Sequence, residues 1–304
     1  MKSDLDADAL CRQAELAEAW GYDSFFLPES HFAGAQSVPD PILLLAAVAA
    51  RTSKIKLGTS SYLLTIRNPL LAAEQIATLD RLCGGRLILG LGRGFQAGML
   101  EAFGVTQRDK RAQFEDILNA MLAAWRGDYV GDPKRLLELS PRPQQNPHPP
   151  LWVAAFGPKA IAQAGSLGLP YLASPVETLA ELEHNHELHR QALQEAQHDT
   201  PREVVIMRTV FISEDEQACA RVRAKLVDAK RVRPTHSEDV AVDDWCLLGT
   251  PDKVREDIVR YQQLLGMTHL IAVRPRVSGV AEELNRISLQ TLQAMRLTPH
   301  STNS

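Results

Sequence analysis

Residues 84–95 read Gly-Gly-Arg-Leu-Ile-Leu-Gly-Leu-Gly-Arg-Gly-Phe. The run is apolar and has the length of a strand, which is typical of a strand covered on both faces of a parallel sheet, although periodicity alone leaves a buried helical turn open. Gly90, Gly92 and Gly94 at its end would let a ligand lie against bare backbone. Arg93 among them is a fixed cation that suits a phosphate. We predict that this strand end forms one wall of a cofactor site.

These glycines have three other conceivable interpretations. In the first, the glycines have no role beyond relieving crowding inside a barrel. A dinucleotide fingerprint is excluded because Phe95 occupies the position of its third glycine. A phosphate-binding P-loop is excluded because the sequence that follows lacks Lys-Ser/Thr.

Outward from this run, strand and helix signals alternate, and the first element is a helix at residues 6–20. The other strands are expected at residues 22–27, 54–60, 151–155, 170–174, 203–212 and 269–274. Seven strands with covering helices allow an open doubly wound sheet or a (β/α)8 barrel. The length of 304 residues favours the α/β barrel, a single domain over residues 1–304. The first strand of such a barrel, expected before Asp6, is missing.

Three further segments carry organisational signals. Residues 40–51 form a predicted helix that is apolar all round, so its outer face needs a cover, and a subunit interface is the simplest one. Residues 127–150 are rich in proline and residues 234–246 are acidic and irregular. We expect these two segments to be surface excursions that could form a lid over the site.

Composition narrows the class of protein. A formal net charge of −4 gives no reason to expect a nucleic acid as partner, and the longest apolar run, residues 42–50, is too short to cross a membrane. The cysteines lack metal-ligand spacing, which predicts free buried thiols: Cys11, Cys83, Cys219 and Cys246. A cytoplasmic protein fits these features best.

A second anion site is predicted where the strand at 151–155 runs directly into a helix at Pro158. The backbone N–H groups of such a helix start can bind a phosphate without special side chains. Ala155, Phe156 and Gly157 form this turn, and Ser174 ends the next strand. In a barrel, all these strand ends would open on the face where active sites lie.

Histidines occur in two places that could carry chemistry. Glu29, Ser30 and His31 follow the strand at 22–27 and bring a carboxylate, a hydroxyl and an imidazole together, although an imidazole in such a loop is as often incidental as functional. His184, His186 and His189 lie on a charged predicted helix. Metal binding there is conceivable, but we favour a solvated helix face because the first two do not share one side of the helix.

Several stretches together resemble the flavin-dependent bacterial luciferase-like monooxygenases. The matching stretches are residues 17–32, 56–61, 69–82, 85–94, 150–155, 166–170 and 248–252. The resemblance implies a (β/α)8 TIM barrel that binds reduced FMN at its C-terminal mouth and uses O2 to oxygenate a small organic substrate. It also implies a homodimer formed through helices 40–51 and 69–82.

By position, the resemblance implies that Arg93 contacts the FMN phosphate and that Gly94 and Phe95 border the same cofactor. The turn of Phe156, Gly157 and Pro158, with Ala155 before it and Ser174 on the next strand, would lie alongside. Ser60 and Ser61 occupy the place where the family often has a non-proline cis peptide under the flavin ring. His31, with Ser30, would orient the substrate.

Departures from the family pattern limit the expected chemistry. Luciferases have paired histidines where this chain has Ser30 and His31, and a reactive cysteine where it has Gly92. Light emission is therefore not expected. A separate flavin reductase would supply the reduced FMN, because the chain has no dinucleotide fingerprint. Two alternatives remain open, hydride transfer with the deazaflavin F420 and a non-catalytic partner subunit.

Overall fold

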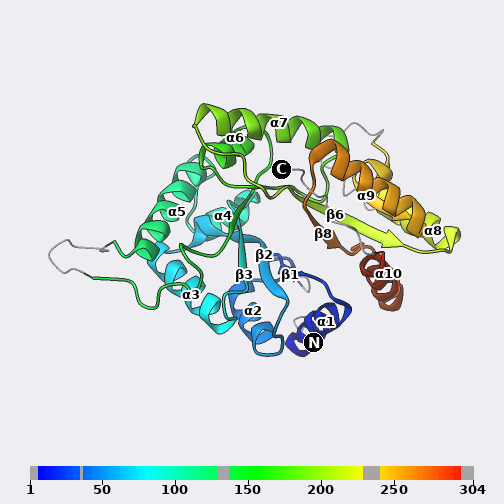
Figure 1. Ribbon diagram of the computed structural model, residues 1–304, viewed down its shortest axis with the longest axis horizontal. Helices are drawn as coiled ribbons and strands as arrows, with labels where there is room; N and C mark the ends of the chain where they lie inside the picture. Colours follow the sequence, from blue (N-terminus) through cyan, green and yellow to red (C-terminus); the bar gives the residue numbers. More distant parts are fainter. Residues whose placement is uncertain (1–5, 35–36, 129–136, 229–239, 296–304) are drawn as a thin grey trace. The chain divides into compact units, whose positions relative to one another are not determined.

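The computed structural model describes residues 6–34, 37–128, 137–228 and 240–295 (Figure 1). The chain divides into two compact units, residues 1–154 and residues 155–304. Both units consist of parallel strands that alternate with helices, so the predicted α/β class is confirmed.

Unit 1 contains four parallel strands that pair in chain order. They are β1 (Ser24–Leu27), β2 (Lys56–Leu63), β3 (Leu87–Gly92) and β4 (Leu151–Ala154). All six residues of β3 are buried, which confirms that the glycine-rich run is a strand covered on both faces. Because the four strands are parallel, their C-terminal ends lie at one edge of the sheet.

The helices of unit 1 begin and end where the sequence provides caps. They are α1 (Ala7–Trp20), α2 (Pro41–Ala49), α3 (Pro69–Leu82), α4 (Ala97–Ala102) and α5 (Lys110–Arg126), with a short 3-10 turn η2 (Leu64–Ile66). The side chains of Asp6, Asp40 and Asn68 accept backbone N–H groups at the starts of the first three. Gly21 ends α1 with a φ of 89°.

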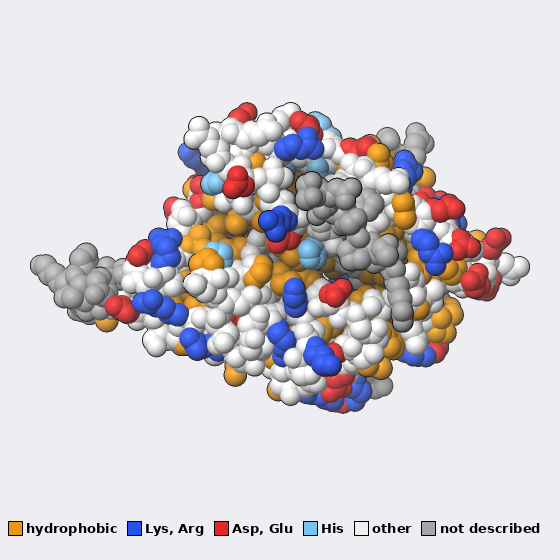
Figure 2. Space-filling view, in the orientation of Figure 1, with side chains coloured by type: hydrophobic (Ala, Val, Ile, Leu, Met, Phe, Trp, Pro, Cys, Tyr) orange, Lys and Arg blue, Asp and Glu red, His pale blue; other side chains and the backbone are white. Residues whose placement is uncertain are grey.

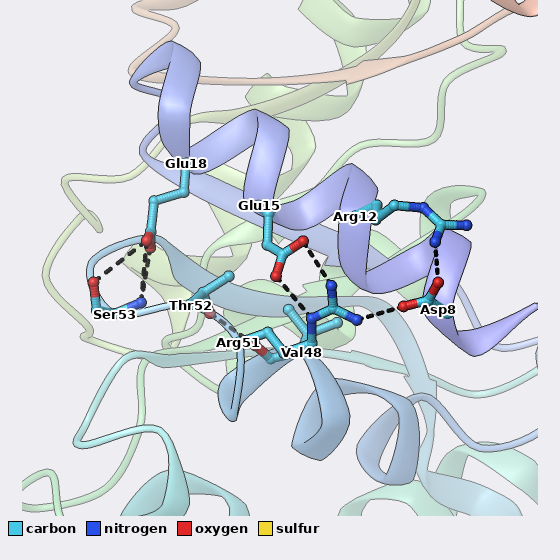
Figure 3. A network of polar contacts seen from close by, with 8 residues as sticks. All are labelled: Asp8, Arg12, Glu15, Glu18, Val48, Arg51, Thr52 and Ser53. Atoms are coloured by element: carbon cyan, nitrogen blue, oxygen red, sulfur yellow. Dashed lines mark hydrogen bonds and ion pairs between the residues drawn. The ribbon is translucent and has the colours of Figure 1, made fainter.

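Polar contacts attach α1 to the connection between α2 and β2 (Figure 3). Arg51 donates to both carboxylate oxygens of Glu15, at 2.7 and 2.9 Å, and to Asp8 at 2.6 Å. Glu18 accepts the backbone N–H groups of residues 53–55. These bonds lower the pKa of Glu18 to about 2, because they stabilise its charged form.

Unit 2 is organised around β6 (Val205–Ile212), which is buried along its whole length. It pairs in parallel with β5 (Tyr171–Leu172), with β7 (Cys246–Gly249) and with β8 (His269–Val273). Its helices are α6 (Pro158–Ser166), α7 (Leu179–Glu195), α8 (Glu216–Asp228), α9 (Pro251–Leu265) and α10 (Glu282–Ala294), with a 3-10 turn η3 (Val242–Asp244).

The strand β7 was not predicted, so the described residues contain eight strands rather than seven. Its location also corrects part of the second lid segment, 234–246. Val242, Trp245 and Cys246 are buried in one apolar cluster with Phe211 and Leu226. These residues belong to the core of unit 2 and do not form a lid; residues 234–239 lie outside the described part.

The first lid segment, 127–150, is also held in place where it is described. Gln145 donates from its backbone N and its Nε2 to Asp80, both at 2.8 Å, and from Nε2 to the carbonyl of Leu87, also at 2.8 Å. Leu87 begins β3, so this part of the segment lies at the opposite end of the strand from Arg93 and does not cover that end. Residues 129–136 lie outside the described part.

The remaining expectations concern the N-terminus, the cysteines and the membrane. The missing first strand concerns residues 1–5, outside the described ranges. The four cysteines are free and buried, as predicted. None of the described helices is long and apolar enough to cross a membrane. Among the side chains coloured in Figure 2, acidic and basic groups are interspersed on the visible face.

Candidate functional site

The C-terminal ends of β2 and β3 fit closely together. The peptide bond between Ser60 and Ser61 is cis, as the resemblance implies. Gly92 faces Ser61 so closely that a Cβ at position 92 would lie 2.1 Å from Ser61 Oγ. With Ser61 in this position, only glycine fits at 92, which gives a physical reason for the departure from the luciferase cysteine.

Arg93 follows directly and is a buried cation. Its side chain donates to the carbonyl of Ala154 at 3.1 Å and its guanidinium carbon lies 5.8 Å from the centre of the Phe114 ring. Burial, followed by the charge of Arg111, lowers the pKa of Arg93 to about 10. The guanidinium stays charged at neutral pH, in a setting that an anion would stabilise.

Two further cations near Arg93 were not predicted from the sequence. Lys110, the first residue of α5, donates from Nζ to the carbonyl of Gly94 at 3.2 Å. Its pKa is lowered by burial and then by the charges of Arg93 and Arg111. Lys110 and Arg111 lie in the first turn of α5, where cations are unfavourable because they oppose the helix dipole. Their unusual position was the sequence signal that could have identified them. The three cations would together suit a phosphate dianion.

The two residues after Arg93 form an open border. Gly94 has a φ of 72°, in the left-handed region that favours glycine. The ring of Phe95 is exposed, and its carbonyl accepts Gln107 Nε2 at 3.2 Å. Ligand sites are commonly lined by aromatic side chains together with a few polar or charged groups.

A buried polar network is centred on Glu29, two residues after the end of β1. Glu29 accepts the backbone N–H of Leu63 at 2.8 Å, and it contacts His31 Nε2 at 2.7 Å and the guanidinium of Arg67. Burial raises the pKa of Glu29, although these three partners and their charges oppose that effect. The guanidinium carbon of Arg67 also lies 4.6 Å from the centre of the Tyr62 ring. Sequence reasoning placed Glu29 and His31 in the loop after this strand but did not identify Arg67 as their partner.

Ser30, the other predicted catalytic residue, has a local structural role. Its hydroxyl accepts the backbone N–H of Val38 at 3.1 Å, and its own backbone N–H donates to the Val38 carbonyl at 3.0 Å. These bonds form a bridge that closes the loop after β1. Ser30 therefore shapes the loop that carries His31.

The remaining predicted cofactor residues belong to unit 2. Gly157, with a φ of 80°, precedes Pro158 at the start of α6 and makes no side-chain cap. Phe156 is exposed, whereas Ala155 is buried. The backbone N–H of Ser174 donates to a Glu177 carboxylate oxygen at 2.5 Å. The expected position of these residues beside Arg93 stays a prediction.

The three histidines of α7 do not all share a solvated face, so that expectation was wrong for two of them. The ring centres of His186 and His189 lie 5.1 and 6.2 Å from that of Tyr171, and His189 Nε2 bonds the Leu169 carbonyl at 2.9 Å. Burial lowers the pKa of His186 to about 4. No group of three metal-ligating side chains occurs among the described residues.

Comparison with known proteins assigns the family. The model of the luciferase-like monooxygenases matches residues 2–268. The chain therefore belongs to the luciferase-like monooxygenase family, as the resemblance suggested.

Two named relatives are oxygenases. Limonene 1,2-monooxygenase of Rhodococcus erythropolis is 32% identical over 195 residues, which cover 59% of this chain and 50% of the relative. The oxygenase component of the flavin-dependent trigonelline monooxygenase of Acinetobacter baylyi is 25% identical, covering 69% of this chain and 60% of the relative. The chain spans about half the length of the curated relatives it matches first.

Solved structures have the same fold. The monooxygenase RslO1 of Streptomyces bottropensis matches 95% of this chain and 92% of its own, with a TM-score of 0.80 and 25% identity. The oxygenating constituent of 3,6-diketocamphane monooxygenase from Pseudomonas putida, in complex with FMN, gives 0.79 at 20% identity, covering 96% and 94%. The F420-dependent tetrahydromethanopterin reductase of Methanopyrus kandleri gives 0.70 at 18%, covering 96% and 95%. The predicted luciferase-like barrel fold is thereby confirmed.

Proposed function

We propose that the protein is a monooxygenase that uses reduced FMN and O2 to oxygenate a small organic substrate. The observation that carries this proposal is the group of three cations, Arg93, Lys110 and Arg111, at the glycine-lined end of β3. Burial, and after it the repulsion between these cations, lowers the pKa of Arg93 and of Lys110, and a phosphate dianion there would offset that repulsion. FMN carries such a dianion.

The residues present fit this cofactor. Arg93 and Lys110 would bind the phosphate, with the turn of Phe156, Gly157 and Pro158 as a second set of contacts. Ser60, Ser61, Gly94 and Phe95 would lie next to the flavin, and Ala155 and Ser174 would complete the border. Reduced FMN would supply the two electrons that allow one atom of O2 to enter the substrate while the other leaves as water.

His31 would orient the substrate, held by Glu29 and by the loop that Ser30 closes. Its Nε2 lies 2.7 Å from the Glu29 carboxylate, which fixes the orientation of the imidazole. A ring fixed in this way can hold a substrate oxygen or move a proton at its other nitrogen.

Two protein partners are part of the proposal. A separate flavin reductase would supply reduced FMN, which is supported by the name of a relative, the oxygenase component of a flavin-dependent monooxygenase. A second copy of the chain would pack against α2 and α3. This is supported by Leu43 and Leu71, whose exposed fractions are 70% and 53%.

F420-dependent hydride transfer is the second candidate, because an F420-dependent reductase shares the fold. Isothermal titration calorimetry of the full chain with FMN, with reduced FMN under argon and with F420 distinguishes the two candidate functions. We expect both FMN forms to bind at least about tenfold more tightly than F420. Tighter binding of F420 would favour hydride transfer, and no binding of any flavin would overturn the proposed function.

A further inference from the structure

His31, Phe32 and Phe103 form a cluster of three rings beside the buried Glu29 network. The ring centres of His31 and Phe103 lie 4.8 Å apart with an angle of 67° between the planes, and Phe32 lies 5.9 Å from Phe103. The exposed fractions of Phe32 and Phe103 are 73% and 41%, whereas the His31 side chain is only 9% exposed. Two phenyl rings that face solvent therefore border an almost covered imidazole.

The backbone of Phe32 makes this arrangement more unusual. Its φ of 56° lies in the left-handed region, which costs a bulky residue about 1–2 kcal/mol. The conformation is unfavourable in the free protein, and a ring that is 73% exposed gains little from burial. Strained backbone conformations of this kind cluster at active sites, ligand clamps and switch regions. The cluster therefore has the character of a binding surface.

The hydrogen bonds of Glu29 fix which nitrogen of His31 carries the proton. Both Glu29 oxygens already accept from groups that can only donate, the Leu63 N–H at 2.8 Å and the Arg67 guanidinium. The ion pair with Arg67 favours the charged carboxylate, which has no proton to donate, so Glu29 is the acceptor and His31 Nε2 is the donor across 2.7 Å. In the neutral imidazole, Nδ1 is then an acceptor, and no described residue donates to it.

We propose that this surface binds the substrate and that the substrate is a phenol-type compound. Its aromatic ring packs against Phe32 and Phe103, and its hydroxyl donates to His31 Nδ1. The inference rests on the proposed function in that it names the substrate class of the same site. A small molecule is the occupant rather than a protein, because the His31 side chain is only 9% exposed and a flat protein surface cannot reach its Nδ1.

Three probes of similar size test the proposal by calorimetry on the full chain, with and without saturating FMN. They are 4-ethylphenol, 4-ethylanisole, which lacks the donor, and 4-ethylcyclohexanol, which lacks the aromatic ring. Loss of one neutral hydrogen bond predicts that 4-ethylanisole binds about threefold to tenfold more weakly. Loss of ring contacts predicts a similar decrease for 4-ethylcyclohexanol. Equal affinities for the three probes, or no binding of 4-ethylphenol, would overturn the proposal.

Variants assign the contacts to residues. Phe32→Leu and Phe103→Leu should each weaken 4-ethylphenol binding about threefold to tenfold, because each loses one aromatic contact. His31→Phe should abolish the preference for 4-ethylphenol over 4-ethylanisole. Val227→Ala, an exposed apolar position on α8, is the matched control and should change neither. If Phe103→Leu fails to fold, Phe32→Leu still tests the surface, because its ring is mostly in solvent.

The affinity for FMN, measured on the same variants, separates the two proposals. FMN binding without 4-ethylphenol binding would overturn the substrate class and leave the cofactor proposal intact. Binding of 4-ethylphenol without any flavin binding would overturn the proposed function and leave the phenol surface supported. An unchanged affinity of Phe32→Leu and Phe103→Leu for 4-ethylphenol would show that the ligand binds elsewhere.

Discussion

At the scale of single residues, the end of β3 combines a glycine that leaves room for a neighbouring side chain with a buried cation. Gly92 leaves the space that Ser61 Oγ occupies, and Arg93 follows it immediately. A larger residue at 92 would displace the Ser61 side chain next to the proposed flavin position. The sequence in this corner is therefore determined by contacts between β2 and β3 as much as by a ligand.

The contact between positions 61 and 92 predicts the outcome of a pair of substitutions. Gly92→Ala should lower the free energy of unfolding by about 1–3 kcal/mol, because its Cβ would overlap Ser61 Oγ. Ser61→Gly in the same chain should recover most of this loss. Urea unfolding of the two single variants and the double variant gives the coupling. Additive effects would contradict the contact.

The cation group predicts the affinity for FMN. Arg93→Ala should raise the dissociation constant at least about tenfold, since a charged hydrogen bond contributes about 1.5–3 kcal/mol. Lys110→Ala should raise it about threefold to fivefold, because that side chain is less buried. Arg126→Ala, which removes an exposed partner of Asp128, is the control. Calorimetry with FMN measures all three, and an unchanged constant for Arg93→Ala would place the phosphate elsewhere.

At the scale of elements, the Glu18 carboxylate of α1 holds the three residues that precede β2. Glu18→Gln should lower the free energy of unfolding at pH 7 by about 1–3 kcal/mol, because the charged acceptor of the N–H groups of residues 53–55 is lost.

The pH dependence of this effect follows from the lowered pKa of Glu18. Its stabilising effect is fully present above the ordinary value of 4.5 and is lost as the pH falls toward about 2. The wild type and Glu18→Gln should therefore converge between these pH values in urea unfolding. Glu256→Gln, at an exposed position of α9, is the control. A constant difference down to pH 2 would contradict the assignment.

Elements with strong local signals were predictable, and those defined by tertiary contacts were not. The apolar run of β3 and the caps Asp40 and Asn68 act within a few residues, so the sequence alone locates them. The strand β7 has only four residues, and its identity depends on pairing with β6. The segment before it looked irregular because the burial of Trp245 cannot be seen in a local pattern.

The candidate site shows the same division. Arg93 was predicted as an anion-binding cation from the glycine-rich strand end itself, and the cis peptide at Ser60 and Ser61 was expected from the resemblance. Lys110 and Arg67 were missed, because their partners are distant in the sequence. Lys110 bonds to Gly94 and Arg67 contacts Glu29. Only the fold brings these side chains together.

At the scale of the whole molecule, exposed leucines on the surface support the proposed association of two copies of the chain. The side chains on most of α2 are buried within unit 1, yet Leu43 is exposed, and Leu71 is exposed on the neighbouring α3. Exposed leucines on two adjoining helices are favoured at an interface between subunits, where the hydrophobic effect stabilises the contact by about 25 cal/mol per Å² of buried apolar area.

Sedimentation equilibrium should therefore find the wild type as a dimer and Leu43→Glu as a monomer, since a buried carboxylate without a partner destabilises an interface by several kcal/mol. Val227→Glu changes an exposed apolar residue of α8 in the same way and should remain a dimer. Circular dichroism confirms that both variants are folded. A Leu43→Glu dimer of wild-type affinity would exclude α2 from the interface, whereas a monomeric wild type would remove the second copy from the proposed assembly.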